Sequence, residues 1–316
     1  MENLLFSINA VFPVFLIVAL GYFLRRKQVI NDNFVDISTK IGFQFALPCL
    51  LFRQIYQIDL KKSFQPKLIG YAVAGTLIIV LLCALIVPHF IKDRKQQGAF
   101  IHCVYRSNYA IIGLPLAINI LGEEGATPAA LLLPFVVPLY NILAVVIFTL
   151  YSPEQHKQKI DFKKLLLDIL KNPLIIGCML GLITAGFHIP LPTMVTKSVG
   201  YLADLATPIA MLALGGQFDF EKAWGNIKIS GTATFFKLIV SPLIFVPLAV
   251  LLGFRGPQLG AVFVLFCAST AVSSYVMAKN MHSDEELCGQ IVLLTTFFSP
   301  FAIFLGTFLL KTFSLI

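Results

Sequence analysis

The sequence predicts an all-α polytopic membrane protein with ten transmembrane helices, arranged as two inverted five-helix repeats with crossed, broken helices four and nine. Three observations support this fold class: the composition, the number of long apolar segments, and an internal repeat. Of the 316 residues, 58% are hydrophobic and 13% are charged, whereas soluble domains are about 45–50% apolar. A single soluble core could not bury so many apolar side chains, so the chain is expected to cross a bilayer several times.

Six segments carry no charge and are long enough to cross the hydrocarbon core as helices, which takes about 20 residues. They are residues 3–24, 68–91, 125–153, 172–196, 256–278 and 287–310. Four further apolar segments, near 34–56, 98–121, 197–218 and 229–253, are interrupted by charges. The first of these four segments is interrupted by Asp36, Lys40 and Arg53, and the other three are interrupted by Arg106, Asp204 and Lys237, in that order. Together these segments predict ten membrane-spanning helices.

Basic residues between the predicted helices indicate the orientation. The loops after the odd-numbered helices contain fourteen lysines and arginines, and the opposite side contains seven. The positive-inside rule therefore predicts cytoplasmic odd loops, with both termini outside the cell membrane. The net charge of +8 is mainly this topology signal. No soluble basic domain is present for a nucleic-acid partner, because the longest polar segment is only residues 151–171.

Other chemistry is not indicated. The sequence contains no Gly-rich phosphate loop and no HExxH motif, and its six cysteines fall inside predicted helices without a CxxC pair. We therefore expect no metal site, no bound cofactor and no enzymatic activity. The only small ions that the sequence leaves as possible partners are a proton or a sodium ion, to which the activity of the protein could be coupled.

Prolines and glycines recur at nearly constant offsets along the chain. Pro13 and Pro173, Gly21 and Gly181, and Pro48 and Pro208 are each 160 residues apart, and Pro138 and Pro300 are 162 apart. This predicts a duplication, with residues 1–155 as the first five-helix repeat, 156–171 as a cytoplasmic connecting loop and 172–316 as the second repeat. Because each repeat has an odd number of helices, the second enters the membrane from the opposite face, as in many secondary transporters.

The fourth predicted helix contains the unusual stretch RSNYAIIGLPLA, residues 106–117. Pro115 lacks the N–H that would bond the carbonyl of Ile111, and Gly113 allows the backbone to leave helical geometry, so a break is expected there. Asn108 can donate and accept hydrogen bonds near the freed backbone groups. A helix start that faces a cavity carries a partial positive charge, which suits a carboxylate. Arg106 either faces an aqueous cavity and attracts an anion or lies near the helix end and reaches the headgroups.

The equivalent stretch of the second repeat is CASTAVSSYVMAKN, residues 267–280. Ser269, Thr270, Ser273 and Ser274 supply four hydroxyl groups that compete for backbone carbonyls, so this helix is also expected to unwind. The hydroxyls could coordinate a substrate oxygen or a sodium ion. The alternative is that they bond back to their own helix.

Two more charges in predicted helices leave several interpretations open. Asp204 can pair with a basic residue, carry a coupling proton, or lie near the membrane interface. The same ambiguity applies to Lys237. Neither residue is assigned a single role from the sequence.

Four motifs in this order and spacing resemble the auxin efflux carrier family. They are LPCLLF (47–52), SNYAIIGLPLA (107–117), TPIAMLALGG (207–216) and VLLTTFFSP (292–300). The resemblance covers essentially the whole chain. The family contains plant auxin exporters and bacterial permeases for small dicarboxylates such as malate or malonate, and the short polar segment between helices five and six is closer to a bacterial member.

The resemblance implies how the helices are used. Helices 1, 2, 6 and 7 would form a scaffold that also supports a homodimer, and helices 3–5 and 8–10 a transport unit in which the fourth and ninth helices cross. The family's asparagine corresponds to Asn108, with Gly113 and Pro115 as the break. Thr270 occupies the position where the family usually has a proline, which leaves the geometry of the second break open.

We therefore expect a secondary transporter of a small organic anion, such as a carboxylate or dicarboxylate. The expected site is the crossover of helices four and nine, and the expected mechanism is an elevator-type movement in the lipid bilayer. The alternative is a membrane-embedded ligand-binding receptor or regulatory protein that retains the transporter fold.

Overall fold

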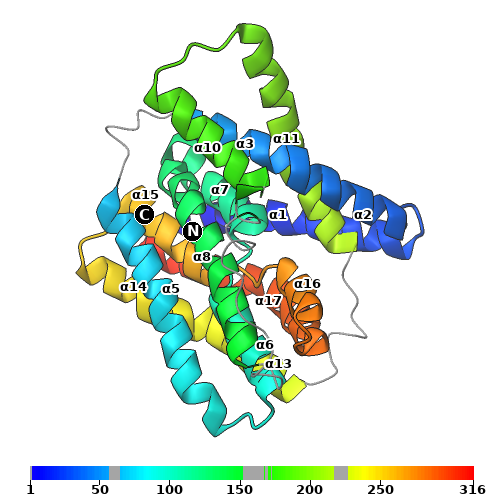
Figure 1. Cartoon of the computed structure of the whole chain (residues 1–316). Coiled ribbons are helices and arrows are strands. Elements are labelled where there is room, and N and C mark those ends of the chain that lie inside the picture. Colours follow the sequence, from blue (N-terminus) through cyan, green and yellow to red (C-terminus); the bar gives the residue numbers. More distant parts are fainter. Residues whose placement is uncertain (1, 57–64, 152–166, 168–169, 172, 217–226) are drawn as a thin grey trace.

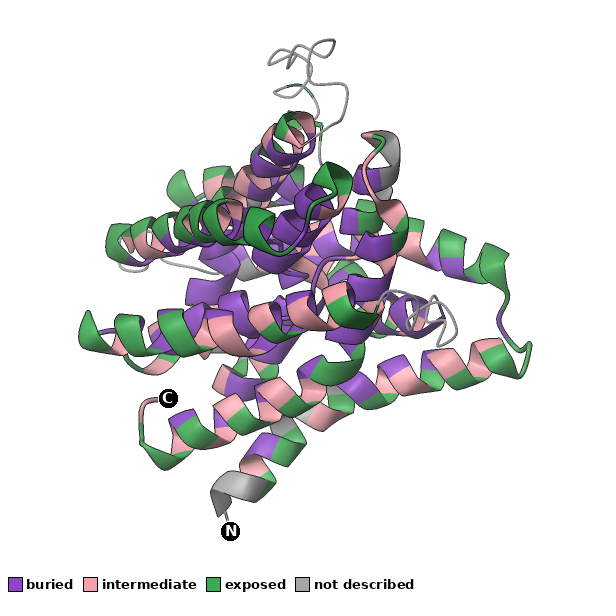
Figure 2. Ribbon diagram, turned by 90° about the horizontal axis from the view of Figure 1, so that it is seen from below, coloured by how far each residue is buried: buried purple, intermediate pink, exposed green. Residues whose placement is uncertain are grey.

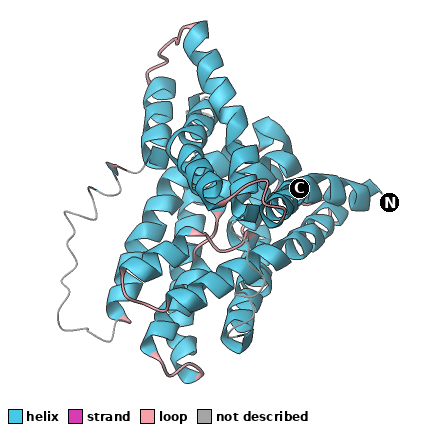
Figure 3. Cartoon of the chain, turned by 90° about the vertical axis from the view of Figure 1, so that its right-hand side faces the viewer, coloured by secondary structure: helices cyan, strands magenta, loops and turns pink. Residues whose placement is uncertain are grey.

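The computed structural model describes residues 2–56, 65–151, 167, 170, 171, 173–216 and 227–316. These residues form helices and connecting loops, and within these ranges no β-strand is assigned (Figure 3). Most of the predicted connecting loop, residues 156–171, lies outside the described residues. The predicted all-α class is therefore confirmed for the part of the chain that is described.

Figure 1 shows the helices in their order along the chain. The first half contains α1 (Glu2–Arg26), α2 (Asp32–Ile41), α3 (Leu47–Tyr56), α5 (Pro66–Ile86), α6 (Arg94–Tyr105), α7 (Leu114–Gly125) and α8 (Thr127–Leu150). The second half contains α10 (Pro173–Gly186), α11 (Thr193–Gly216), α13 (Ile227–Phe235), α14 (Ser241–Leu251), α15 (Gly256–Cys267), α16 (Ser273–Asn280) and α17 (Glu285–Thr312). The short helices η1 (Gly42–Ala46), η2 (Val87–His89), η3 (Tyr109–Gly113) and η4 (Phe236–Val240) continue neighbouring α-helices.

Several helices begin at polar residues that cap free backbone N–H groups. Asn31 accepts the N–H of Phe34 at the start of α2, and Asp284 accepts the N–H of Leu287 at the start of α17, both over 2.9 Å. Asp93 caps α6 in the same way. A capping side chain satisfies one of the donors that a helix start leaves without an intrahelical partner. These polar residues therefore fix where apolar helices begin.

Among the described residues, six helical segments are long and apolar enough to cross a membrane, by length and composition. They are Asp32–Arg53, Pro66–His89, Thr127–Leu150, Thr193–Gly216, Ile227–Leu251 and Glu285–Thr312. Three shorter apolar helices, Tyr109–Gly122, Pro173–Gly186 and Gly256–Cys267, accompany them. The chain is thus a multi-pass membrane protein.

One of the predicted charge-free spans is wrong as drawn from the sequence. Residues 172–196 do not form one helix, because α10 ends at Gly186 and α11 begins only at Thr193. Pro190 and Pro192 lie between them, and proline cannot continue a preceding helix. Residues 256–278 are divided too, since α15 ends at Cys267 and α16 begins at Ser273, and this interruption falls in the stretch where the sequence predicted that the helix unwinds.

The helices pack in two groups. Helices α1, α2, α3, α10 and α11 pack on one another, and helices α5, α6, α8 and α13 to α17 form the second group; α1 also packs on α17, and α7 contacts helices of both groups. The closest approach in the first group is between α1 and α11. A Cβ atom on Gly215 would lie 1.9 Å from the carbonyl oxygen of Val18, and one on Gly21 would lie 2.3 Å from that of Leu212. Only glycine allows two helix backbones to come this close.

Burial follows the pattern of a helical membrane protein (Figure 2). Apolar side chains fill the contacts between helices, and many large apolar residues remain on the outer faces. On α5 the exposed ones include Leu77, Ile78, Leu81 and Leu85. Exposed apolar faces of this kind are suited to lipid chains.

Candidate functional site

The helix that begins at Arg94 is interrupted after Tyr105. Arg106 has an extended backbone, with φ −82° and ψ 109°, and helical structure resumes at Tyr109 as η3. The break therefore precedes the position predicted from the sequence. Gly113 is the last residue of η3, and Pro115 is the second residue of α7. Because η3 runs directly into α7, Pro115 lies inside a helix that starts at Tyr109, and it does not end that helix.

A second interruption lies between α15 and α16. Ala268 is extended, with φ −63° and ψ 149°, and helical structure resumes at Ser273. The two interruptions run antiparallel and pair with each other, with Ser107 opposite Thr270. The N–H of Asn108 donates to the carbonyl of Ser269 over 2.7 Å, and the N–H of Ala271 donates to the carbonyl of Arg106 over 3.4 Å. Each break thus satisfies backbone groups that the other leaves free.

Thr270 connects the two broken helices through its side chain as well. It is fully buried, and its hydroxyl donates to the carbonyl oxygen of Cys103 in the last turn of α6, 2.8 Å away. Its own N–H donates to the hydroxyl of Thr295 on α17 over 3.1 Å. Among the four predicted hydroxyls, this one bonds across to another helix, so it does not follow the alternative of bonding back to its own.

Arg106 lies inside the protein, with an exposed fraction of 7%. Its guanidinium donates to the side-chain oxygen of Asn141 over 3.0 Å and to the carbonyl of Tyr140 over 3.4 Å, both on α8. It also contacts the sulfur of Met277 on α16 at 3.2 Å. This buried position does not fit the alternative in which the side chain reaches the headgroups.

Lys237 is a site residue to which sequence reasoning assigned no role. It lies in η4 with an exposed fraction of 1%, and its ammonium donates to the hydroxyl of Ser107 over 2.6 Å. Ser107, which was not predicted as a site residue, in turn donates to the carbonyl of Leu265 over 2.5 Å. The signal in the sequence was a lysine in an otherwise apolar segment, but nothing there indicated that it would meet residue 107.

We call the place where the two interruptions, residues 106–108 and 268–272, pair with each other the crossing. Several polar atoms at the crossing have no hydrogen-bond partner among the described residues. They are the amide nitrogen Nδ2 of Asn108, the Nε of Arg106, and the hydroxyls of Ser269 and Ser274. All four residues are buried, and Ser273 is half-buried at the start of α16. Unpartnered buried polar groups are costly. The crossing is therefore closed to solvent, and it contains hydrogen-bond donors without acceptors as well as the cationic side chains of Arg106 and Lys237.

The structure brings most of the predicted site residues together and leaves Asp204 elsewhere. Asp204 lies on α11 and forms an ion pair with Arg53 of α3, with 2.7 Å between Nη1 and Oδ1. Its side chain is 67% exposed on the surface of the protein. The structure therefore agrees with the alternative in which Asp204 pairs with a basic residue. A role of Asp204 in proton coupling stays a prediction.

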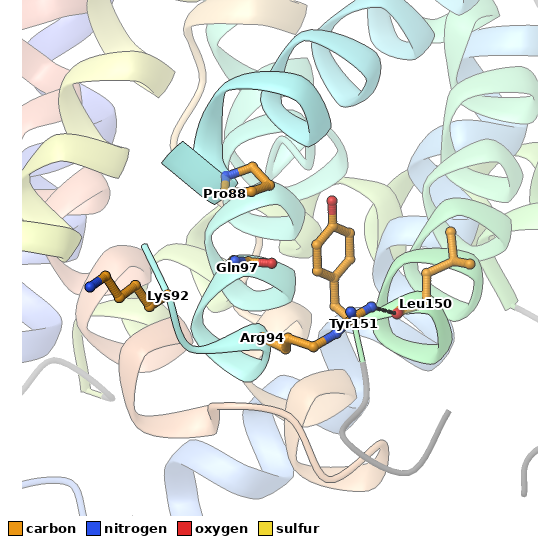
Figure 4. A pocket seen from close by; sticks show the side chains of 6 residues that line it. All are labelled: Pro88, Lys92, Arg94, Gln97, Leu150 and Tyr151. Carbon is orange, nitrogen blue, oxygen red and sulfur yellow. Dashed lines mark hydrogen bonds between the residues drawn. The ribbon is translucent and has the colours of Figure 1, made fainter. Parts of the chain in front are cut away.

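A pocket lies away from the crossing (Figure 4). It has a volume of about 550 Å³ and is lined by Pro88, Lys92, Arg94, Gln97, Leu150 and Tyr151. Figure 4 shows Arg94 reaching toward Leu150, whose carbonyl it binds over 2.6 Å. Because Arg94 and Arg106 lie at opposite ends of α6, about 18 Å of helix separates this pocket from the crossing. None of the predicted site residues lines it.

Comparison with known proteins adds three relatives and a family. The chain is 24% identical to an uncharacterized transporter of Methanocaldococcus jannaschii, over 96% of this chain and 98% of the relative. It is 23% identical to an uncharacterized transporter of Methanothermobacter thermautotrophicus, over 93% and 95% of the two chains. It is also 23% identical to a protein of Rhizobium meliloti named provisionally as a malonate transporter, over 92% and 91%.

The family comparison covers nearly the whole sequence. Residues 6–305 match the family described as membrane transport protein. This match includes both interrupted helices and the residues that pair between them. The chain therefore belongs to the membrane transport protein family, which is the auxin efflux carrier family that its motifs resemble.

Proposed function

We propose that this chain is a secondary transporter that carries a small organic anion, a carboxylate or dicarboxylate, with its binding site at the crossing of the two interrupted helices. The observation that carries the proposal is the pairing of Arg106–Asn108 with Ala268–Ala271. Broken helices that meet inside a membrane protein expose backbone groups and helix ends, which are the usual elements of transporter sites.

The chemistry of the crossing favours an anion. Arg106 and Lys237 bring two cationic groups to it, and Asn108 and Ser269 add polar atoms without partners. Residues 109–113 begin a helix directly after Asn108, so the partial positive charge of a helix start also points to this place. A carboxylate can accept hydrogen bonds from donors of each of these kinds.

The substrate class agrees with one relative. The Rhizobium meliloti protein is named provisionally as a malonate transporter, and malonate is a small dicarboxylate. At 23% identity this name does not transfer the substrate by itself. It makes malonate the first compound to test.

The arrangement of helices supports an elevator-type movement of one group against the other. We propose that α1 to α3, α10 and α11 form the scaffold, and that the remaining helices form a transport unit carrying the crossing. The equal lengths of α6 and α15, at 12 residues each, agree with two inverted repeats of five helices, residues 1–155 and 172–316, joined by 156–171. Dimerisation through the scaffold is part of the same proposal.

Location and coupling complete the proposal. The protein would lie in the cell membrane with both termini outside, as the distribution of basic residues indicates. No cofactor is needed for this mechanism. A proton or a sodium ion remains the candidate for coupling, with Asp204 or the hydroxyls of residues 269–274 as the groups involved.

Counterflow of radiolabelled malonate into proteoliposomes that contain unlabelled malonate tests the transport function. We expect Asn108→Ala to abolish malonate binding and counterflow while the purified protein stays monodisperse. Asn119→Ala is the matched control, since Asn119 is an exposed asparagine of α7. Unchanged binding in Asn108→Ala would remove Asn108 from the site.

The same experiment separates a transporter from a receptor. A receptor that retains the fold would bind malonate in detergent but would give no counterflow in proteoliposomes. A transporter gives both signals with the wild-type protein.

A further inference from the structure

The pocket of Figure 4 lies where two membrane-spanning segments end. The span Pro66–His89 ends next to Pro88, which lines the pocket, and the span Thr127–Leu150 ends at Leu150, which lines it too. Residues at the ends of apolar spans lie at the depth of the lipid headgroups. A volume of about 550 Å³ is within the range of sites that bind small molecules. The pocket is therefore placed where a headgroup can enter it.

The pocket carries positive charge. Lys92 and Arg94 line it, and none of its six lining residues is acidic. Within the described ranges of the chain, neither cation forms an ion pair. The carboxylate of Asp93 accepts the N–H of Gln96 over 3.2 Å and so caps the start of α6. Residues 92–95 carry three positive charges and one negative charge, so an anion is attracted to this end of α6.

Arg94 is held in place and keeps donors for a ligand. The central carbon of its guanidinium is 5.7 Å from the centroid of the Tyr151 ring, and one terminal nitrogen donates to the carbonyl of Leu150 over 2.6 Å. A guanidinium group has five N–H donors in one plane, and this hydrogen bond uses one of them. The others suit two oxygens of one phosphate group, which arginine binds in a bidentate manner.

Lys92 lies at the rim of the pocket. Gln97 is buried and donates its side-chain amide to the carbonyl of Ile91 over 2.7 Å, which anchors the residue before the lysine. The side chain of Lys92 is exposed, and in Figure 4 its ammonium points away from Tyr151. Its flexible four-carbon stem allows this charge to turn toward a headgroup that Arg94 holds.

The apolar part of the lining distinguishes a lipid from a soluble anion. Pro88, Leu150 and the ring of Tyr151 form this part. Leu150 is also exposed on the outside of α8, and Leu85 and Ile86 are exposed on the last turn of α5. A phosphate ion gains nothing from such surfaces, whereas a lipid carries its phosphate next to apolar chains and covers both kinds of surface at once.

We propose that this pocket binds a membrane lipid with an anionic phosphodiester headgroup. Arg94 binds the phosphate oxygens, Lys92 adds its charge at the rim, and the acyl chains lie along the last turns of α5 and α8. Basic pockets between transmembrane helices bind such headgroups in other membrane proteins. The distribution of basic residues predicts that this end of α6 faces the cytoplasm, and the anionic lipids of that leaflet attract basic segments.

Native mass spectrometry of the full-length purified protein tests the inference. The protein is mixed with equal amounts of phosphatidylglycerol and phosphatidylcholine that have identical acyl chains, so that the two lipids differ in headgroup charge. We expect the wild type to retain more phosphatidylglycerol. Arg94→Gln should lower the affinity for this lipid about 5-fold, and Arg94→Gln with Lys92→Gln about 30-fold, while binding of phosphatidylcholine changes little.

A second double variant provides the matched control. Arg26 and Lys27 are exposed at the end of α1, on the face of the membrane that is expected to be the same, and Arg26→Gln with Lys27→Gln removes the same number of charges. This variant should retain phosphatidylglycerol as the wild type does. An equal loss in both double variants would show a general attraction to surface charge and would overturn the pocket, as would unchanged binding in the variant that lacks Lys92 and Arg94. Gel filtration shows that each variant is folded.

Soluble anions distinguish a lipid from a free phosphate. Glycerol 3-phosphate and inorganic phosphate carry the phosphate without acyl chains, and at the concentration of the lipid they should leave phosphatidylglycerol bound. Displacement by either compound would show that the pocket takes its ligand from water, and displacement by malonate would make it part of the substrate path. Both results would overturn the inference. None of these measurements involves transport, so their outcome is independent of the proposed function.

Discussion

The hydroxyl of Thr270 donates a hydrogen bond to the carbonyl oxygen of Cys103, 2.8 Å away, and so ties the second interrupted helix to the last turn of the first. Cys103 is near the end of α6, where helix carbonyls lose their intrahelical partners. A side chain from a distant part of the sequence thus caps this helix end. The crossing is held by this bond and by the two backbone hydrogen bonds on either side of Ser107.

Thr270→Val removes this hydroxyl at nearly constant volume. The carbonyl of Cys103 then remains buried without that partner, so we expect a loss of about 1–3 kcal/mol in the free energy of unfolding. A thiol-reactive fluorescent dye can follow thermal unfolding in detergent, because Cys83, Cys103, Cys267 and Cys288 are buried in the folded protein.

Thr76→Val is the matched control for this variant. Thr76 is also buried, but its hydroxyl donates to the carbonyl of Ala72 in its own helix. Bonds of this kind add little to helix stability, so Thr76→Val should unfold close to the wild-type temperature. Equal effects of the two substitutions would show that the bond between Thr270 and Cys103 has no special role in holding the crossing.

Much of the fold was predictable from the sequence because lipid imposes simple rules. Charge-free apolar segments predicted where helices such as α5, α8 and α17 lie, and their observed bounds agree within a few residues. Prolines were harder to interpret. Pro190 and Pro192 end a helix that composition alone extended to residue 196, because apolar content says nothing about a missing backbone donor.

The candidate site shows the same limit at shorter range. The sequence indicated an interrupted helix around residues 106–117, but it placed the break at Gly113 and Pro115, not at Arg106–Asn108. Local propensity identifies residues that can break a helix. The place where the helix breaks depends on the segment of the second half with which it pairs. The pairing of Ser107 with Thr270 and its contact with Lys237 join distant segments, and no local pattern encodes them.

Arg106→Gln is expected to separate binding from stability. The substitution removes a buried charge that has no carboxylate partner among the described residues, so unfolding of the ligand-free protein should occur at an equal or higher temperature. The same change should weaken malonate binding by about 2–5 kcal/mol, because it removes one partner of the proposed ion pair. Calorimetry and thermal unfolding on the same preparation give both values. Normal affinity would exclude Arg106 from anion binding.

Asp204→Asn tests whether this carboxylate couples transport to protons. Its ion pair with Arg53 is largely exposed, so its loss should cost at most about 1 kcal/mol of stability. Because it joins α3 to α11 away from the crossing, we expect malonate uptake and its response to an imposed pH gradient to stay as in the wild type. Loss of that response with binding intact would assign the coupling proton to Asp204.

Gly215→Ala is expected to disrupt the contact between α1 and α11. The added Cβ would lie 1.9 Å from the carbonyl oxygen of Val18, inside the backbone of the neighbouring helix, so the helices must move apart. Overpacking of this kind costs about 1–3 kcal/mol or more, and the yield of monodisperse protein and its unfolding temperature should both fall.

Gly200→Ala on the same helix provides the comparison, since nothing lies within 4 Å of a Cβ built there. It should keep wild-type yield and unfolding temperature, because alanine also suits a helix better than glycine. Malonate binding by Gly215→Ala protein that survives purification should remain near wild type, because the substitution lies in the first helix group and leaves the crossing intact. A stable, fully folded Gly215→Ala variant would contradict the close approach of α1 and α11.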